Sequence, residues 1–297
     1  MKKISILLAS AVLVACGQSQ VADEKTVAAA TEQTPAEIDA LAIVLDAQSD
    51  ELKARYAYRH PQETLEFVGI EPGMTVVEGL PGGGWYSKIL VPYLGADGHL
   101  IGADYSLEMY PNFNFVNEEF MANQQQWTTN FPAGAREWGG DNGARVSAFH
   151  MGSMPDEFAG TADVVFFPRV LHNLARFESQ GGYLTAALAD AYAVLKPGGT
   201  LGIVQHEARA DTSDEFANGS RGYLKKDFVI EVVEAAGFEF VGESDVNANP
   251  KDQPGDGDFV WRLPPTLATS RDNPELQAEL EAVGESNRMT LKFRKPE

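Results

Sequence analysis

An arginine, a histidine and an asparagine stand close together directly after a run of apolar residues. The run covers 161–167, and the polar residues are Arg169, His172 and Asn173. A histidine with the ordinary pKa of about 6.5 can accept a proton at neutral pH. We expect His172 to act as a general base or as a hydrogen-bond acceptor for a substrate, with Arg169 holding an anionic group and Asn173 orienting the substrate. In the alternative interpretation, His172 only packs against or caps the following helix.

A second group of residues has the layout of a nucleotide or nucleoside cradle. Glu78 follows a short apolar run, the glycines Gly82, Gly83 and Gly84 come next, and a helix is predicted from Ser87. Glycine can adopt a positive φ and lets a ligand approach the backbone, and the N–H groups at the start of a helix are free to donate. The carboxylate of Glu78 can accept hydrogen bonds from such a ligand. The alternative is an ordinary tight turn between a strand and a helix.

Strands that alternate with helices must position these residues. Short apolar runs bounded by turn residues predict strands over 76–77, 98–104, 145–149, 161–167 and 200–205. Asp104 ends the second of these runs, 26 residues after Glu78, which is the length of one strand–helix–strand unit. An acid at that place commonly binds ribose hydroxyls. The sequence therefore predicts an α/β fold with a doubly wound sheet.

In this order and spacing, the motifs resemble those of the S-adenosylmethionine-dependent methyltransferases of class I, which have a Rossmann-like sheet. More narrowly, the chain is similar to a bacterial group of predicted methyltransferases with a Pro-Gly-Gly-Gly-Trp-Tyr first motif and a lipoprotein signal. The resemblance covers the chain from Ala54 onward. It rests on the first motif at 78–84, Asp104, the segment 163–173, the Leu-Lys-Pro-Gly-Gly sequence at 195–199 and the C-terminal 293–296.

The resemblance implies a mostly parallel, seven-stranded sheet with an N-terminal helical extension, and S-adenosylmethionine as the cofactor. Glu78 and the backbone of the glycine turn would face the methionine part of the cofactor, and Asp104 would bind its ribose. The segment that holds Arg169, His172 and Asn173 would face the transferred methyl group. Because the methyl group is already activated on a sulfonium, positioning and proton removal supply most of the catalysis, and no catalytic triad is required.

Two positions depart from the pattern of the family. Leu80 stands where the first motif usually has a glycine. After the third predicted strand, many relatives place an aspartate on the adenine amino group, whereas this chain has the stretch 150–154, which begins with His150. The acid that would bind the adenine amino group is therefore missing, and His150 is not assigned that role.

The start of the chain resembles a bacterial lipoprotein signal. Lys2 and Lys3 precede an apolar run over 4–15, which is shorter than the ~20 residues that span a bilayer. The Leu-Val-Ala-Cys sequence ends at Cys16, which such signals lipidate after cleavage. Gly17 in place of an aspartate would favour the outer membrane, so the resemblance implies a lipid-anchored protein of the periplasm. An uncleaved anchor or a plain signal peptide is the alternative.

The predicted organisation is a signal peptide over 1–15, a flexible tether over 16–35 and a single methyltransferase-like domain over 36–297. Apolar residues at helical spacing predict one helix over 36–58 and a second that begins at Pro61, so that 36–70 is the N-terminal helical part. In the resembling family such helices close over the cofactor, which would bring Tyr56, Tyr58, Arg59 and His60 to the lid of the site. The alternative is that they only cover the sheet.

Composition excludes several classes of function. The net charge of −20, without a basic patch, argues against nucleic acid as a partner. The five histidines show no spacing of metal ligands, and a single cysteine forms no intramolecular disulfide. The long stretches 110–141 and 245–274 are expected near the carboxyl ends of the strands, where open α/β sheets bind ligands.

Two functions of different classes follow from these observations. The first is an exported or membrane-tethered methyltransferase that acts on a small molecule or an envelope component. The second is a lipoprotein that keeps the methyltransferase fold as a non-catalytic ligand-binding or structural module. Supply of S-adenosylmethionine outside the cytoplasm is not assured, which favours the second function. The joint presence of Glu78, the glycine turn and Asp104 favours the first.

Overall fold

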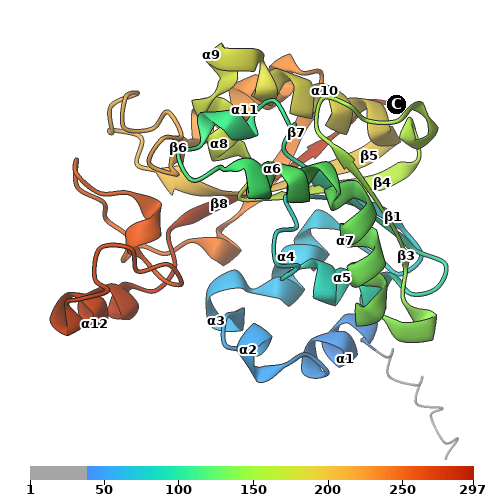
Figure 1. Ribbon diagram of the computed structural model, residues 1–297, viewed down its shortest axis with the longest axis horizontal. Helices are drawn as coiled ribbons and strands as arrows, with labels where there is room; N and C mark the ends of the chain where they lie inside the picture. Colours follow the sequence, from blue (N-terminus) through green and yellow to red (C-terminus); the bar gives the residue numbers. More distant parts are fainter. Residues whose placement is uncertain (1–38) are drawn as a thin grey trace, which may run out of the picture. The chain divides into compact units, whose positions relative to one another are not determined.

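One twisted sheet organises the part of the chain that the structure, a computed structural model, describes, which is residues 39–297 (Figure 1). The predicted leader, the tether and the lipidation site at Cys16 lie outside these residues. The strands are β1 (Thr75–Gly79), β2 (His99–Asp104), β3 (Arg145–His150), β4 (Ala162–Pro168), β5 (Leu195–Ala208), β6 (Leu224–Lys225), β7 (Glu239–Ser244) and β8 (Arg288–Arg294).

The strand order β3-β2-β1-β4-β5-β8-β7 makes the sheet doubly wound, because the order reverses between β1 and β4. Neighbouring strands from β3 to β5 are parallel, whereas β8 is antiparallel to both β5 and β7. The two-residue β6 pairs with β5 outside this order. The prediction of a mostly parallel, Rossmann-like sheet of seven strands is confirmed, with β6 as an addition.

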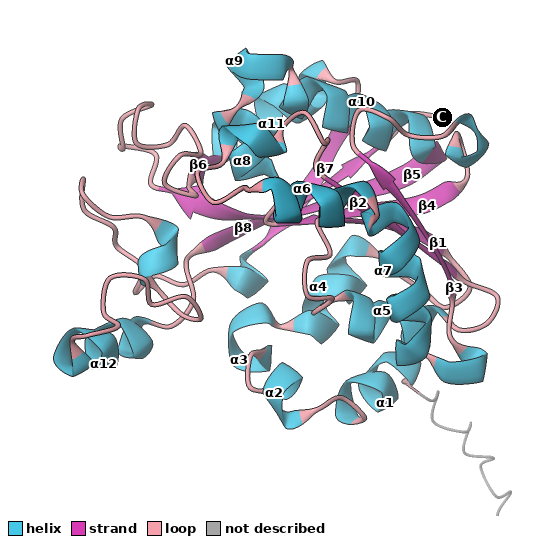
Figure 2. Cartoon of the chain, in the orientation of Figure 1, coloured by secondary structure: helices cyan, strands magenta, loops and turns pink. Residues whose placement is uncertain are grey.

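Helices cover both faces of the sheet (Figure 2). Within residues 39–297 they are α1 (Ala40–Asp46), α2 (Asp50–Lys53), α3 (Tyr56–Arg59), α4 (Pro61–Val68), α5 (Ser87–Leu94), α6 (Glu118–Gln125), α7 (Trp127–Ala135), α8 (Leu171–Arg176), α9 (Glu178–Gly181), α10 (Tyr183–Val194), α11 (Lys226–Ala235) and α12 (Pro274–Val283). Short 3-10 helices lie at Tyr110–Asn112, Arg136–Trp138, Gly140–Asn142, Asp156–Phe158, Asp245–Asn247 and Val260–Arg262.

Alternating side chains of the strands build a core on each face. Val77 of β1 belongs to the core that α8, α10 and α11 cover, and its neighbour Val76 belongs to the core that α1, α4, α5 and α7 cover. The period of two residues in a strand sends successive side chains to opposite faces. Because both faces are buried, the strands are continuous apolar runs, as the sequence indicated.

The prediction of a single helix over 36–58 is wrong. The described part of this segment forms three short helices, α1, α2 and α3. Ser49 starts a new helix because its side chain accepts a hydrogen bond from the backbone N–H of Leu52 at 3.3 Å. His60 ends α3 with a φ of 39°, directly before Pro61, and a residue before proline is disfavoured in the helical conformation. Caps and a proline therefore divide a continuous apolar pattern.

The predicted turn at 195–199 lies inside a strand. Leu195 of β5 pairs with Ala162 of β4, and pairing resumes between Thr200 and Val164, so the intervening residues form a bulge. Gly198 within it has a φ of 74°, which favours glycine. The bulge keeps the turn geometry that the sequence indicated and lets β5 begin earlier.

The stretch 110–141 contains α6 and α7 and packs through α7 on β3, and the stretch 245–274 follows β7. No helix among residues 39–297 has the length and apolar character needed to cross a membrane. In the same residues, no three His, Cys, Asp or Glu side chains are grouped as metal ligands would be.

Candidate functional site

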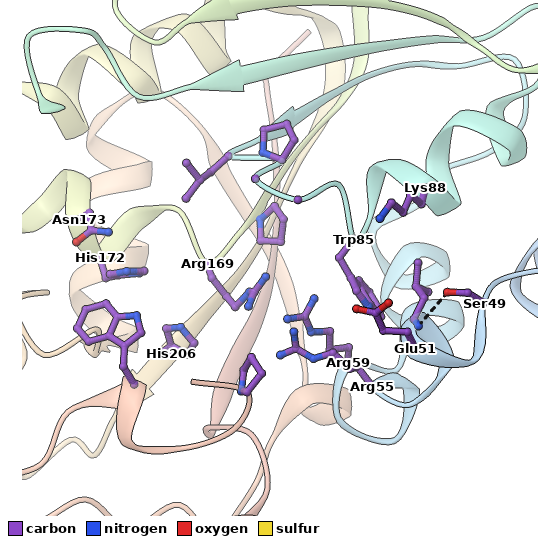
Figure 3. A pocket seen from close by; sticks show the side chains of 18 residues that line it. Ser49, Glu51, Arg55, Arg59, Trp85, Lys88, Arg169, His172, Asn173 and His206 are labelled. Carbon is purple, nitrogen blue, oxygen red and sulfur yellow. Dashed lines mark hydrogen bonds between the residues drawn. The ribbon is translucent and has the colours of Figure 1, made fainter. Parts of the chain in front are cut away.

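A cavity of about 710 Å³ opens at the carboxyl ends of β1 and β4 (Figure 3). It lies where the strand order reverses, which is the usual ligand site of an open α/β sheet. It is lined by α2 and α3, the glycine turn after β1, the start of α5, the β4–α8 turn, the end of β5, and the segment that holds Trp261 and Pro265. The described N-terminal helices thus form one wall, rather than only covering the sheet.

The structure brings five of the predicted site residues to this cavity. They are Gly82 and Gly83 from the glycine turn and Arg169, His172 and Asn173 from the β4–α8 turn. These two groups are about 90 residues apart in the sequence, and the parallel pairing of β1 with β4 places them side by side. The glycine turn and the polar triplet, which is Arg169, His172 and Asn173, therefore line the same cavity.

The two predicted carboxylates lie outside the cavity and are buried. Glu78 is 1% exposed, and its Oε2 accepts a hydrogen bond from the hydroxyl of Ser87 at 2.5 Å. Asp104 is 4% exposed, and its Oδ1 accepts hydrogen bonds at 2.7 Å from the backbone N–H of Tyr105 and from the hydroxyl of Tyr110. In this conformation Oδ1 of Asp104 is held by hydrogen bonds from within the chain.

The backbone of the glycine turn is open at one position and packed at another. A Cβ on Gly83 would meet nothing within 4 Å, so a ligand can approach the backbone there. A Cβ on Gly84 would lie 2.3 Å from the ring of Trp138, so this glycine serves packing. Leu80, in place of the usual glycine, has a φ of 50°, the left-handed conformation that glycine favours. Leu80 therefore adopts the backbone conformation that a glycine would favour at this position.

Arg169 also has a left-handed backbone, with a φ of 66°. A long side chain rarely adopts this conformation, and such strain gathers at functional sites. The backbone N–H of Arg169 donates to the carbonyl of Val204 at 2.6 Å, which ties the turn to β5. Arg169 thus leaves β4 in a direction that brings its side chain to the cavity (Figure 3).

Four arginines gather around one carboxylate beside the cavity. Glu285 Oε1 lies 2.7 Å from Nε of Arg55, and its Oε2 lies 3.4 Å from Nε of Arg59 and 3.2 Å from Nη1 of Arg288. Arg169 makes no ion pair within the described part of the chain. Burial alone would raise the pKa of Glu285, but the charges of Arg288, Arg59 and Arg55 outweigh it and lower this pKa.

Arg59 is the most enclosed of the arginines that line the cavity. It is 2% exposed, its guanidinium lies 4.4 Å from the ring centroid of Trp85, and its Nη1 has no hydrogen-bond partner. The indole face attracts a guanidinium and holds it in place. Trp85 also lines the cavity, and its buried Nε1 likewise lacks a partner. Two donors at this wall are left for a ligand.

His172 has a defined tautomer. The side-chain amide of Gln205 donates to the carbonyl of Gly222 at 2.9 Å, which turns its Oε1 toward Nδ1 of His172 at 3.4 Å. The proton of the neutral ring is therefore on Nδ1, and Nε2 is left as an acceptor. Burial lowers the pKa of His172 to about 4, aided by Arg169. The pKa of 6.5 assumed from the sequence does not hold.

A second histidine stands beside the first. The rings of His206 and His172 are 5.5 Å apart, and Nδ1 of His206 lies 2.6 Å from the hydroxyl of Ser286. Burial, followed by the neighbouring His172, lowers the pKa of His206. Asn173 lies next to this pair, and its side-chain Oδ1 is buried without a partner, while its Nδ2 donates to the hydroxyl of Tyr105 at 3.4 Å.

A glycine, Gly219, packs closely against the backbone of α8. Gly219 has a φ of 89°, and a Cβ there would lie 2.0 Å from the carbonyl oxygen of His172 and 3.2 Å from the backbone N of Arg176. Only glycine fits this contact, because both the φ and the space exclude a side chain. The position of His172 therefore depends on Gly219.

Glu78 should give the stability of the protein a distinct pH dependence. Burial raises its pKa to about 7, although the hydrogen bond from Ser87 acts in the other direction. The folded state then holds this proton more tightly than the unfolded chain does, so the free energy of unfolding falls as pH rises from about 4.5 to about 7. In the variant Glu78→Gln, the free energy of unfolding should lack this pH-dependent decrease, which we expect to be about 3 kcal/mol in the wild type.

Urea unfolding of both proteins between about pH 5 and about pH 8 measures this difference. His172 and His206, whose pKa values are lowered, contribute the opposite slope in both proteins, and the comparison cancels them. Identical slopes in the two proteins would contradict the raised pKa of Glu78.

Sequence comparisons match no family model and no curated protein. Solved structures that are similar to the chain include the [4+2]-cyclase SpnF, with 18% identity over 80% of each chain and a TM-score of 0.47. A SAM-dependent methyltransferase from Aquifex aeolicus is 14% identical over 86% of this chain and 98% of its own, with a TM-score of 0.47. Geranyl diphosphate methyltransferase in complex with SAM is 14% identical over 88% of this chain and 92% of its own, also at 0.47. With sequence identities of 14–18% and TM-scores of 0.47, this similarity does not assign an activity to the chain.

The arrangement fits S-adenosylmethionine at one end. The open backbone at Gly83 and the acceptors beside it suit the methionine part and the reacting methyl group. At the other end, Asp104 does not line the cavity, and its Oδ1 accepts a hydrogen bond from the hydroxyl of Tyr110. The residues that line the cavity therefore suit the methionine part of the cofactor, whereas Asp104, the residue predicted to bind the ribose, lies outside the cavity.

Proposed function

We propose that the chain is an S-adenosylmethionine-dependent methyltransferase whose reaction takes place in the cavity between β1 and β4. One observation carries this proposal: the glycine turn and the polar triplet of Arg169, His172 and Asn173 line the same cavity at the point where the strand order reverses. A purely structural role requires neither an open backbone at Gly83 nor unpaired donors and acceptors in the walls.

The residues of the chain have separate roles in this proposal. The backbone at Gly82 and Gly83 binds the cofactor, which supplies an activated methyl group. His172 Nε2 and Asn173 Oδ1 accept hydrogen bonds from the O–H or N–H group of the methyl acceptor. When bound, the cofactor would supply the methyl group to the acceptor atom, and the proton that this atom loses would pass to His172 or to water. Positioning supplies most of the rate.

Gly83→Ile should block the cavity without disturbing the fold. The new side chain would extend into open space, because a Cβ at this position meets nothing within 4 Å. We expect the affinity for S-adenosylhomocysteine to fall about tenfold or more, since steric overlap costs about 1–3 kcal/mol. Isothermal titration of wild type and variant measures this change. Gly242→Ile in β7, where a Cβ also meets nothing, is the matched control. Equal affinities in all three proteins would place the cofactor elsewhere.

A specific observation favours the second function, a non-catalytic ligand-binding module with the same fold. The carboxylate of Asp104 is enclosed by Tyr110 and Tyr105 and does not reach the cavity. Titration of the wild type with S-adenosylmethionine and S-adenosylhomocysteine separates the two functions. Micromolar binding supports the methyltransferase, and no binding at millimolar concentration supports the binding module. In Tyr110→Phe, which removes one of the two hydrogen bonds to Oδ1 of Asp104, tighter binding would show that this tyrosine is the obstacle.

We also propose that Cys16 carries a lipid, that the mature protein begins at this residue, and that it is held at the outer membrane facing the periplasm. The support is the sequence around Cys16. An envelope location would give the enzyme a small molecule or an envelope component as its substrate. Expression of Cys16→Ser with labelled palmitate tests the proposal, because the variant should remain unlabelled. Unchanged attachment to the membrane would contradict it.

A further inference from the structure

Positive charge around the cavity exceeds the negative charge that pairs with it. Arg55, Arg59 and Arg288 share the single carboxylate of Glu285, and Arg169 has no ion pair among the described residues. Lys88 also lines the cavity, opposed by one exposed carboxylate, Glu51, at its edge. The remaining acid near Arg169 is Glu78, which is hydrogen bonded to Ser87 and whose pKa burial raises to about 7.

Burial and the excess of positive charge lower the pKa values of two arginines, Arg59 and Arg169. Burial, followed by the repulsion of Arg169, lowers the pKa of Arg59 to about 9. The pKa of Arg169 is lowered as well, by burial and then by Arg288. Buried charges without partners are costly, and a bound anion would relieve both desolvation and repulsion. The whole protein carries a net charge of −20, so this cluster differs in sign from the rest of the molecule.

The unpaired atoms give the ligand a direction. Nη1 of Arg59 and Nε1 of Trp85 are donors without a partner, whereas Oδ1 of Asn173 is an acceptor without a partner. Figure 3 shows Arg59 and Trp85 on one side of the cavity, Asn173 and His172 on the other, and Arg169 between them. A complementary ligand therefore carries acceptor atoms at the arginine side and a hydrogen-bond donor at the asparagine side.

We propose that the cavity binds a molecule with a dianionic oxyanion group, of the phosphate monoester class, at Arg59 and Arg169, and with a hydroxyl or amine that donates to Oδ1 of Asn173. The geometry of guanidinium groups matches such an oxyanion in bidentate fashion. That this molecule is the methyl acceptor, with the hydroxyl or amine as the methylated group, rests on the proposed function. The binding itself does not.

The charge of the cofactor strengthens the case for a separate anion. S-adenosylmethionine has a sulfonium, an ammonium and one carboxylate, so its binding adds positive charge to the cavity rather than removing it. The acceptor must then supply the compensating negative charge. A dianion beside Arg169 also offsets the charge that helps to lower the pKa of His172, so the histidine becomes a better base once the acceptor is bound.

Isothermal titration with inorganic phosphate and with glycerol 3-phosphate tests the proposal, at constant ionic strength set with chloride. Wild type is expected to bind both probes. Arg59→Gln and Arg169→Gln should each weaken binding about tenfold or more, the usual loss for a hydrogen bond to a charged group. Arg169 makes no ion pair in the described structure, so its variant keeps the fold if Arg59→Gln does not. Arg209→Gln, at an exposed pair with Asp211, is the matched control.

Asn173→Leu tests the direction of the ligand. This variant should bind glycerol 3-phosphate, which carries hydroxyl groups, more weakly than wild type does. Its affinity for inorganic phosphate should be unchanged. No binding of either probe to wild type at millimolar concentration would overturn the proposal. Equal binding by wild type, Arg59→Gln and Arg169→Gln would also overturn it. Because the cofactor is titrated separately, phosphate binding without S-adenosylhomocysteine binding would reject only the proposed function, and the reverse result would reject only this inference.

A phosphate monoester can be a free metabolite or the headgroup of a lipid. Vesicles of phosphatidylcholine with and without phosphatidic acid separate these sources, with the full chain carrying Cys16→Ser so that no lipid anchor contributes. Binding that requires phosphatidic acid, is competed by glycerol 3-phosphate and is lost in Arg169→Gln identifies a lipid headgroup. Binding of glycerol 3-phosphate without vesicle binding identifies a soluble ligand. Vesicle binding that Arg169→Gln retains would contradict a headgroup in the cavity.

Discussion

Replacing Glu285 by glutamine is expected to lower the free energy of unfolding by about 3–5 kcal/mol, the usual loss when one partner of a buried ion pair is removed. Glu285 is 5% exposed, and its carboxylate pairs with Arg55, Arg59 and Arg288. Without it, several guanidinium groups would repel one another in a region that water hardly reaches. Urea unfolding of both proteins, monitored by circular dichroism, measures the difference.

The control is Glu239→Gln, which removes an exposed ion pair with Arg294. It should change the free energy of unfolding by less than about 1 kcal/mol, because solvent screens exposed pairs. Phosphate at millimolar concentration should restore part of the stability of Glu285→Gln if the anion binds between the arginines. A variant as stable as wild type in plain buffer would show that the arginine cluster does not depend on this carboxylate.

Gly219→Ala is expected to cost about 2–5 kcal/mol of unfolding free energy and to displace His172. The cost combines a left-handed φ of 89° with a Cβ that would lie 2.0 Å from the carbonyl oxygen of His172, and overpacking against backbone cannot be relieved by a change of rotamer. Thermal unfolding measures the stability. The Nε2 signals of the histidines in NMR spectra report whether the ring has moved.

Gly73→Ala separates strain from collision. Gly73 has a φ of 80°, but a Cβ there meets nothing within 4 Å, so this variant should lose only about 1 kcal/mol. Equal losses at both glycines would mean that backbone strain alone sets the cost. The predicted collision with His172 would then be wrong.

The strands that hold the site were predictable because their signals are local. Val76 and Val77 form an apolar run bounded by turn residues, and the parallel sheet buries both of them. The ends of these strands then fixed the place of the glycine turn and of Arg169. Residues that follow a strand directly are carried to the edge of the sheet whatever the rest of the chain does.

The charge of the cavity could not be predicted in the same way. Arg55 and Arg59 are 230 and 226 residues from their partner Glu285. No local pattern links such residues, and the sequence suggested only that Arg59, together with Tyr56, Tyr58 and His60, comes near the site. The burial of Asp104 could not be predicted for another reason. Tyr110 is only six residues away, but the direction of its hydroxyl depends on how the intervening turn packs.

The sharing of Glu285 also sets the order in which the protein can be completed during synthesis. The helices that carry Arg55 and Arg59 emerge from the ribosome early, and domains begin to fold from the N-terminal side. Their ionic partner Glu285 and the guanidinium of Arg288, which donates to the carbonyl of Tyr58, arrive only with the last residues of the chain. The arginine wall of the cavity is therefore finished last, together with β8, and a chain cut short before Glu285 would lack both the strand that joins β7 to the sheet and a closed binding site.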